Sequence, residues 1–133
     1  MAATKLDHIN IRTARLAESV VFYRDALGMP VVPPPGETDL SRGVYVQDAA
    51  GVAIVHLVAA PAVPSSPGPV RGKAQRGMVD HFALACSDPA GFRQRLKARG
   101  VPFDDMVQPE TGSELIFVRD PNEVLIELNF TAG

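Results

Sequence analysis

Short stretches of alternating apolar and polar residues occur in the first half of the chain, and one stretch with helical spacing lies among them. Alternation places successive side chains on opposite faces of a strand, whereas apolar residues three or four apart share one face of a helix. We expect the helix to end at Gly28, because Pro30 cannot continue it. The elements predicted in this half are strands at 6–11, 31–32, 43–48 and 52–58 and a helix at 16–27.

The same order of elements returns after a proline-rich stretch. The run from residue 59 to residue 72 contains four prolines and two glycines, which indicates an extended linker. Ser87 or Asp88 can cap the helix that follows the next strand, and Gly100 can end it. The elements predicted in the second half are strands at 79–84, 101–103, 114–119 and 124–130 and a helix at 89–99.

The two halves form an internal repeat. Asp7-His8 returns as Asp80-His81 after 73 residues, and Gly28 and Tyr45-Val46 return as Gly100 and Phe117-Val118 after 72. Each half is only about 60 residues long, which favours two halves that share one core. The sequence therefore predicts an α+β fold of two tandem βαβββ modules in one domain, 1–133. Module 1 covers about 4–60, the linker about 61–77 and module 2 about 78–130.

Composition and charge exclude several classes of function. Hydrophobic residues make up 46% and charged residues 21%, which is typical of a folded globular protein. A net charge of -2 gives no electrostatic argument for nucleic acid or an anionic membrane. No apolar run approaches the roughly 18 residues of a membrane span, and no N-terminal stretch resembles a signal peptide. A single cysteine, Cys86, excludes an internal disulfide, and we expect a buried, inert thiol and a cytoplasmic protein.

The chain has three histidines, and all three fall in predicted strands. His8 and His81 occupy equivalent places in the first strand of each half, and His56 and Glu127 occupy nearly equivalent places in the last strand. A pseudo-twofold relation between the halves would bring these four side chains to one centre. Three imidazoles and one carboxylate suit a divalent transition metal such as Fe, Mn, Co, Ni or Zn.

Simpler interpretations of these residues stay open. A lone histidine in a strand is more often hydrogen-bonded within the structure than a metal ligand, and Glu127 can lie on the solvent side of a strand. His56 follows Asp48 by eight residues, whereas Glu127 follows Asp120 by seven. A difference in the hairpin turn would absorb the extra residue, but a register difference would turn His56 to the other face. His8, His81 and Glu127 could then form a two-histidine, one-carboxylate triad without it.

Other polar side chains on the predicted third strands are interpreted as ordinary face residues. Tyr45 lies on this strand in the first half, and Glu114 and Arg119 lie on it in the second. No glycine-rich phosphate loop, dinucleotide fingerprint or nucleophile elbow is present.

The sequence resembles the vicinal oxygen chelate superfamily, which includes glyoxalase I, extradiol dioxygenases, methylmalonyl-CoA epimerase, and fosfomycin-resistance and bleomycin-binding proteins. The residues that carry the resemblance cover most of the chain except the linker. They are Leu6-Asp-His-Ile-Asn-Ile11, Phe22-Tyr-Arg-Asp-Ala-Leu-Gly-Met29, Val79-Asp-His-Phe-Ala-Leu84 and Phe117-Val-Arg-Asp-Pro-Asn-Glu-Val-Leu-Ile-Glu-Leu128.

The resemblance implies paired βαβββ modules whose curved mixed sheets close around a metal cleft, with ligands at His8, His56, His81 and Glu127. It implies a divalent-metal-dependent lyase, isomerase or dioxygenase that acts on a small oxygenated metabolite, with Glu127 as the group that moves a proton. Glyoxalase I typically has a glutamate at the position of His56, so this chain lacks one carboxylate of that type. The alternative is a metal-independent protein that binds a small molecule, like the bleomycin-resistance members. The family also implies a homodimer.

Overall fold

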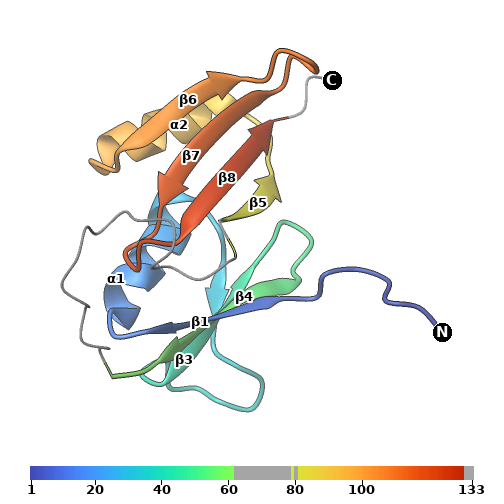
Figure 1. Ribbon diagram of the computed structural model, residues 1–133. Helices are drawn as coiled ribbons and strands as arrows, with labels where there is room; N and C mark the ends of the chain where they lie inside the picture. Colours follow the sequence, from blue (N-terminus) through green and yellow to red (C-terminus); the bar gives the residue numbers. More distant parts are fainter. Residues whose placement is uncertain (62–78, 80, 131–133) are drawn as a thin grey trace. The chain divides into compact units, whose positions relative to one another are not determined.

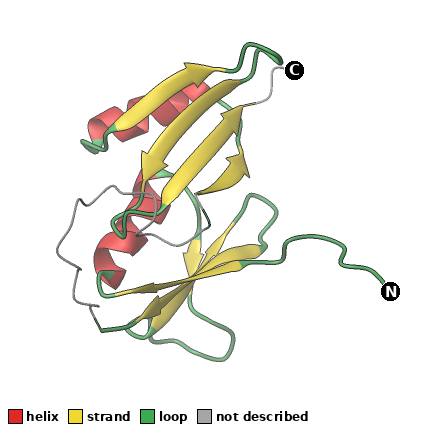
Figure 2. Ribbon diagram, viewed as in Figure 1, coloured by secondary structure: helices red, strands yellow, loops and turns green. Residues whose placement is uncertain are grey.

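The computed structural model describes residues 1–61, 79 and 81–130, and its contacts divide the chain into two compact units, Met1–Ala62 and Val63–Gly133. Each unit contains one four-stranded sheet and one helical segment (Figures 1 and 2). The first unit contains β1 (Ile9–Thr13), α1 (Leu16–Val21), the π-helix η1 (Phe22–Ala26), β2 (Val31–Val32), β3 (Gly43–Gln47) and β4 (Ala53–Ala59). The second contains β5 (His81–Ala85), α2 (Pro89–Ala98), β6 (Phe103–Val107), β7 (Glu114–Arg119) and β8 (Leu125–Phe130).

The two sheets have the same topology. Their strand orders are β1-β4-β3-β2 and β5-β8-β7-β6. In each sheet the first strand pairs parallel with the last, and the remaining neighbours pair antiparallel. A parallel pair needs a long crossover connection, and the helix after the first strand begins that connection. The predicted pair of βαβββ modules with mixed sheets is therefore confirmed.

Strand alternation separates a buried face from a more polar face in the first sheet. Val44 and Val46 of β3 are paired with Leu57 and Val55 of β4, and all four side chains are fully buried or nearly so. Contacts between α1 and β4 place the helical segment against this sheet. The residues between them in sequence, such as Tyr45 and His56, therefore point to the opposite face.

In the second unit α2 covers one face of the sheet. Phe92 of α2 packs edge-on against Phe130 of β8, with the ring centroids 5.4 Å apart. The Arg93 guanidinium donates hydrogen bonds to Asp105 on β6 at 2.9 Å and to Glu114 on β7 at 2.8 Å. The interpretation of Glu114 as an ordinary face residue therefore agrees with its structural role.

A π-helix accommodates an extra residue in the first half. The segment from His8 to Gly28 is one residue longer than the segment from His81 to Gly100. A π-helical turn contains one residue more than an α-helical turn, so η1 can absorb this residue while the helix still ends at an equivalent glycine. Both glycines adopt positive φ angles, 70° for Gly28 and 66° for Gly100, which L side chains rarely adopt.

Several predicted boundaries need correction. The first strand begins at Ile9 rather than at residue 6, so His8 lies one residue before β1 and outside the ladder. β6 runs from Phe103 to Val107 rather than over 101–103, and Asp88 rather than Ser87 caps α2 by accepting from the Gly91 N–H at 3.1 Å. The predicted linker lies outside the described residues except for residue 61. Within the described part of the chain, no helix is long and apolar enough to cross a bilayer.

Candidate functional site

Three aromatic rings stack on the polar face of the first sheet. His56 on β4 is paired with Tyr45 on β3 and with Asn10 on β1, so these three side chains share one face, called here the histidine face. The Tyr45 and His56 rings are nearly parallel, with centroids 3.8 Å apart and an angle of 3° between their planes. The His8 ring lies against His56 with a centroid distance of 3.9 Å and an angle of 15°.

A β-bulge, and not the hairpin turn, keeps His56 on this face. The two hairpin turns are equivalent, because the Asp48 N–H donates to the Val52 carbonyl at 2.9 Å and the Asp120 N–H donates to the Val124 carbonyl at 3.0 Å. The register instead shifts between Val46 and Gln47, where the β3–β4 pairing passes over Ile54. Of the two alternatives that the sequence left open, neither a longer turn nor a flipped register accounts for the extra residue, because a bulge in the strand accommodates it.

The bulge makes His56 equivalent to Glu127. Each lies opposite an aromatic residue on the third strand of its sheet, Tyr45 for His56 and Phe117 for Glu127. Each also lies opposite the residue that follows its candidate partner histidine by two positions, Asn10 in β1 and Ala83 in β5.

The two histidines of the first unit have different surroundings. The His8 Nδ1 donates to the Asp7 carboxylate at 2.7 Å, and this hydrogen bond lowers the pKa of Asp7. A histidine that donates through one nitrogen to a carboxylate can present the other to a metal ion. Burial lowers the pKa of His56, nearby His8 lowers it further, and a hydrogen bond from the ring to the Ala53 backbone acts in the opposite direction. The lowered pKa favours the neutral ring, which is the form that coordination requires.

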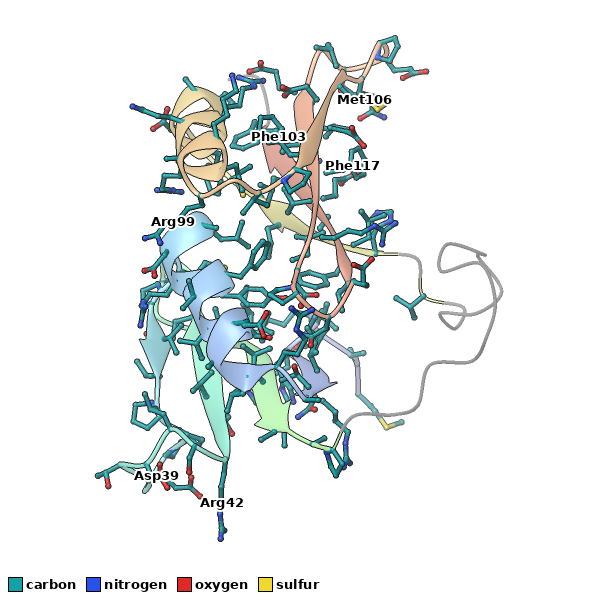
Figure 3. All side chains as sticks on the ribbon, turned by 90° about the vertical axis from the view of Figure 1, so that its left-hand side faces the viewer. Asp39, Arg42, Arg99, Phe103, Met106 and Phe117 are labelled. Atoms are coloured by element: carbon teal, nitrogen blue, oxygen red, sulfur yellow. The ribbon has the colours of Figure 1, made fainter. Side chains whose placement is uncertain are left out.

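His81 and Glu127 share one face of the second sheet. Glu127 on β8 is paired with Ala83 on β5, and His81 lies two residues before Ala83 on the same side of its strand. The His81 ring meets Phe117 edge-on, with centroids 6.3 Å apart. Figure 3 shows Phe117 on one side of this sheet and Phe103 on the other, which faces α2. His81 and Glu127 therefore lie on the face that α2 does not cover.

Each unit thus contains two of the four predicted ligands. His8 and His56 belong to the first unit, and His81 and Glu127 belong to the second. Among the described residues, no three His, Cys, Asp or Glu side chains form a group that could hold an ion. A site with four ligands consequently requires donors from both units. The donors on each face, imidazoles in one sheet and an imidazole with a carboxylate in the other, suit a divalent transition metal.

Two partners of the candidate ligands were missed in the sequence. Tyr45 was interpreted as an ordinary face residue, but it stacks on His56. Asp7 was noticed only as part of a repeated sequence motif, although its carboxylate orients His8. The repetition of the Asp-His dipeptide in both halves was a signal for the second of these. A hollow of about 230 Å³ borders the same face and is lined in part by Asn10, Tyr45 and His56.

Cys86 is a poor nucleophile in this environment. Burial raises the pKa of its thiol to about 11, and the Sγ–H donates to the Leu84 carbonyl at 3.5 Å. We expect Cys86 in the native protein to be alkylated by iodoacetamide at pH 8 about tenfold more slowly than in guanidinium chloride, since the lower thiolate fraction outweighs its greater nucleophilicity. Mass spectrometry of a time course measures both rates. Equal rates would contradict an inert thiol.

Comparisons with known proteins agree with this architecture. The family model of the Glyoxalase/Bleomycin resistance protein/Dioxygenase superfamily matches residues 5–128. No curated protein is similar enough in sequence to match. Among solved structures, a lactoylglutathione lyase from Agrobacterium tumefaciens is 19% identical with a TM-score of 0.65, and the alignment covers 98% of this chain and 96% of that one.

Two further solved structures have the same fold. A glyoxylase/bleomycin resistance protein/dioxygenase domain from Frankia sp. EAN1pec is 15% identical with a TM-score of 0.75, over 98% of this chain and 94% of that one. The fosfomycin resistance protein FosX from Listeria monocytogenes is 17% identical with a TM-score of 0.69, and the alignment covers 98% of this chain and 96% of that one. At these identities the likeness shows the fold. With the family model matching nearly the whole chain, the protein belongs to the Glyoxalase/Bleomycin resistance protein/Dioxygenase superfamily.

Proposed function

We propose that this protein is a metal-dependent enzyme in which His8, His56, His81 and Glu127 bind one divalent transition metal ion. The observation that carries the proposal is the equivalence of the two pairs. His56 and Glu127 take the same register position in their sheets, although the sequence between turn and ligand differs by one residue. A bulge that preserves the position of one side chain is typical of a functional site.

The proposed substrate is a small metabolite with two neighbouring oxygens or with an oxygen that becomes anionic during the reaction. A bound metal ion stabilises such negative charge as it develops. Glu127 is the proposed proton-transfer group, because it is the one carboxylate among the four ligands and the neutral imidazoles hold the ion. The reaction is proposed to be that of a lyase or isomerase, or of a dioxygenase. The fold shared with a lactoylglutathione lyase supports the first of these.

The second candidate is a metal-independent protein that sequesters a small molecule. The hollow beside His56 and a second hollow of about 650 Å³ in the other unit, lined in part by Phe117, Arg119 and Leu125, could hold such a ligand. This alternative does not explain why the histidine and carboxylate positions are equivalent in the two sheets. Metal content distinguishes the two candidates.

A homodimer in the cytoplasm, with the two modules acting as one domain, is proposed for the assembly. Family resemblance supports the dimer, and a long connection between the modules lets ligands come from one chain or from two. Sedimentation at tens of micromolar protein measures the assembly. A monomer that retains full metal content would contradict a site shared between chains.

Metal analysis of untagged protein tests the proposed function. Protein purified without chelators and reconstituted near pH 7.5, where imidazoles are neutral, is expected to hold close to one equivalent of a transition metal. Glu110→Gln, which removes an exposed carboxylate outside the proposed site, is the matched control and should hold the same amount. A content below about 0.1 equivalent for every metal offered would contradict the proposal and favour the binding protein.

A further inference from the structure

The His56 ring is held between two other rings and a backbone carbonyl. Tyr45 covers one side of it at 3.8 Å and His8 covers the other at 3.9 Å. The ring also donates a hydrogen bond to the Ala53 backbone, at the residue where the bulge shifts the register. These contacts define the plane of the imidazole and leave its second nitrogen as the one that can bind a ligand.

His8 and His56 cannot both direct nitrogen lone pairs at one ion while they are stacked. The lone pair of an imidazole nitrogen lies in the plane of its ring, and two nearly parallel planes 3.9 Å apart do not converge. One ring must turn. His8 is exposed and precedes β1, whereas His56 lies within β4 and is paired on both sides. His8 is therefore the ring that turns, and Tyr45 stays as the ring in contact with His56.

The equivalent residue of the other sheet makes a different contact. Phe117 lies opposite Glu127, just as Tyr45 lies opposite His56, but it meets His81 edge-on at 6.3 Å rather than face to face. Of the two equivalent aromatic residues, Tyr45 stacks face to face on the residue opposite it, and Phe117 makes an edge-on contact with His81 instead. The Tyr45 ring thus lies parallel to the imidazole beside it, whereas the Phe117 ring lies nearly perpendicular to the imidazole of His81.

We propose that Tyr45 is a positioning residue that fixes the ring plane of His56, so that the second imidazole nitrogen is oriented for metal coordination. This inference rests on the proposed function, because it assigns Tyr45 a role toward the proposed ion. The aromatic ring and not the hydroxyl provides the support. Phenylalanine at position 45 should therefore preserve the orientation of the His56 ring, and an aliphatic side chain should not.

Cobalt(II) binding by Tyr45→Leu and Tyr45→Phe tests the inference. We expect the dissociation constant, measured by competition with a chromophoric chelator, to rise about tenfold in Tyr45→Leu and to stay within about twofold in Tyr45→Phe. Glu110→Gln is the control, since Glu110 is exposed and lies outside the proposed site. If Tyr45→Leu does not fold, Tyr45→Thr replaces it, because a β-branched side chain suits a strand.

Proton NMR of the metal-free protein gives a second readout that does not depend on activity. The ring current of Tyr45 should add to the upfield shift of the His56 ring protons in the wild type and in Tyr45→Phe, and this shift should decrease in Tyr45→Leu, where the His8 ring alone is stacked on His56. Cobalt affinity of Tyr45→Leu equal to the wild type would overturn the inference and leave the proposed function standing. An equal loss of cobalt affinity in Tyr45→Phe and Tyr45→Leu would also overturn the inference about Tyr45. Failure of the wild type itself to bind any transition metal would overturn both.

Discussion

Replacing His81 by alanine is expected to weaken binding of a divalent transition metal at least about a hundredfold, since loss of a partner behind a ligand already costs 10- to 100-fold. His8→Ala should have an effect of similar size, because each change deletes a nitrogen donor from a different unit. Isothermal titration with zinc and cobalt measures affinity and stoichiometry. Glu110→Gln again serves as the control for a change in surface charge.

Unchanged metal content in both histidine variants would refute the ligand assignment. Variants of His56 then distinguish a four-ligand site from a three-ligand site. If four residues bind the ion, His56→Ala should lose affinity like the other two histidine variants, and His56→Glu should keep a metal while changing the preferred one. If His8, His81 and Glu127 bind the ion as a triad, His56→Ala should lower the metal affinity less than about tenfold. Tenfold is the lower end of the loss expected when a residue that supports a ligand is removed.

Glu127→Gln is expected to separate coordination from proton transfer. An amide oxygen can still coordinate weakly, so the variant should retain metal, but an amide cannot accept the proton that a carboxylate accepts. We expect the rate to fall about 100-fold or more, the size of a general-base contribution. The measurement is turnover on whichever oxygenated metabolite the wild type converts in a substrate panel, with metal content determined on the same samples.

A Glu127→Gln variant that keeps both its metal and its full rate would remove Glu127 as the proton-transfer group. Loss of metal and rate together would contradict the expectation that the amide still coordinates the ion. Glu114→Gln is the matched control, since Glu114 is a carboxylate on the neighbouring strand that pairs with Arg93 of α2. Its rate should stay close to that of the wild type, because it lies on the face that the helix covers.

The repeated order of elements was predictable from the sequence because it depends on local physics. Alternation identifies the strands around Tyr45 and Glu127, and glycines at Gly28 and Gly100 end the helices at positive φ angles that few other residues adopt. The offset between the halves then aligned His8 with His81. Fold class and candidate ligands followed from these patterns without any knowledge of contacts.

Boundaries were less predictable, because a strand ends where its partner ends. Alternation extends from residue 6, but β1 begins at Ile9, where pairing with Val55 of β4 begins. β6 continues to Val107 although its residues after Phe103 are exposed and two of them are aspartates, because β7 provides backbone partners along its whole length. Hydrogen bonds to a neighbouring strand outweigh the weak preference of such a sequence.

Local patterns were enough to place His56 and Glu127 in comparable strands and to show that their spacings from the preceding turns differ by one residue. Where that residue goes depends on strand pairing in the folded protein. A turn, a bulge and a shifted register are compatible with the same local sequence, and pairing of β3 with β4 selects the bulge that keeps His56 opposite Tyr45. The ring stack on the histidine face follows from that choice, because contacts across strands depend on register, which local sequence patterns do not encode.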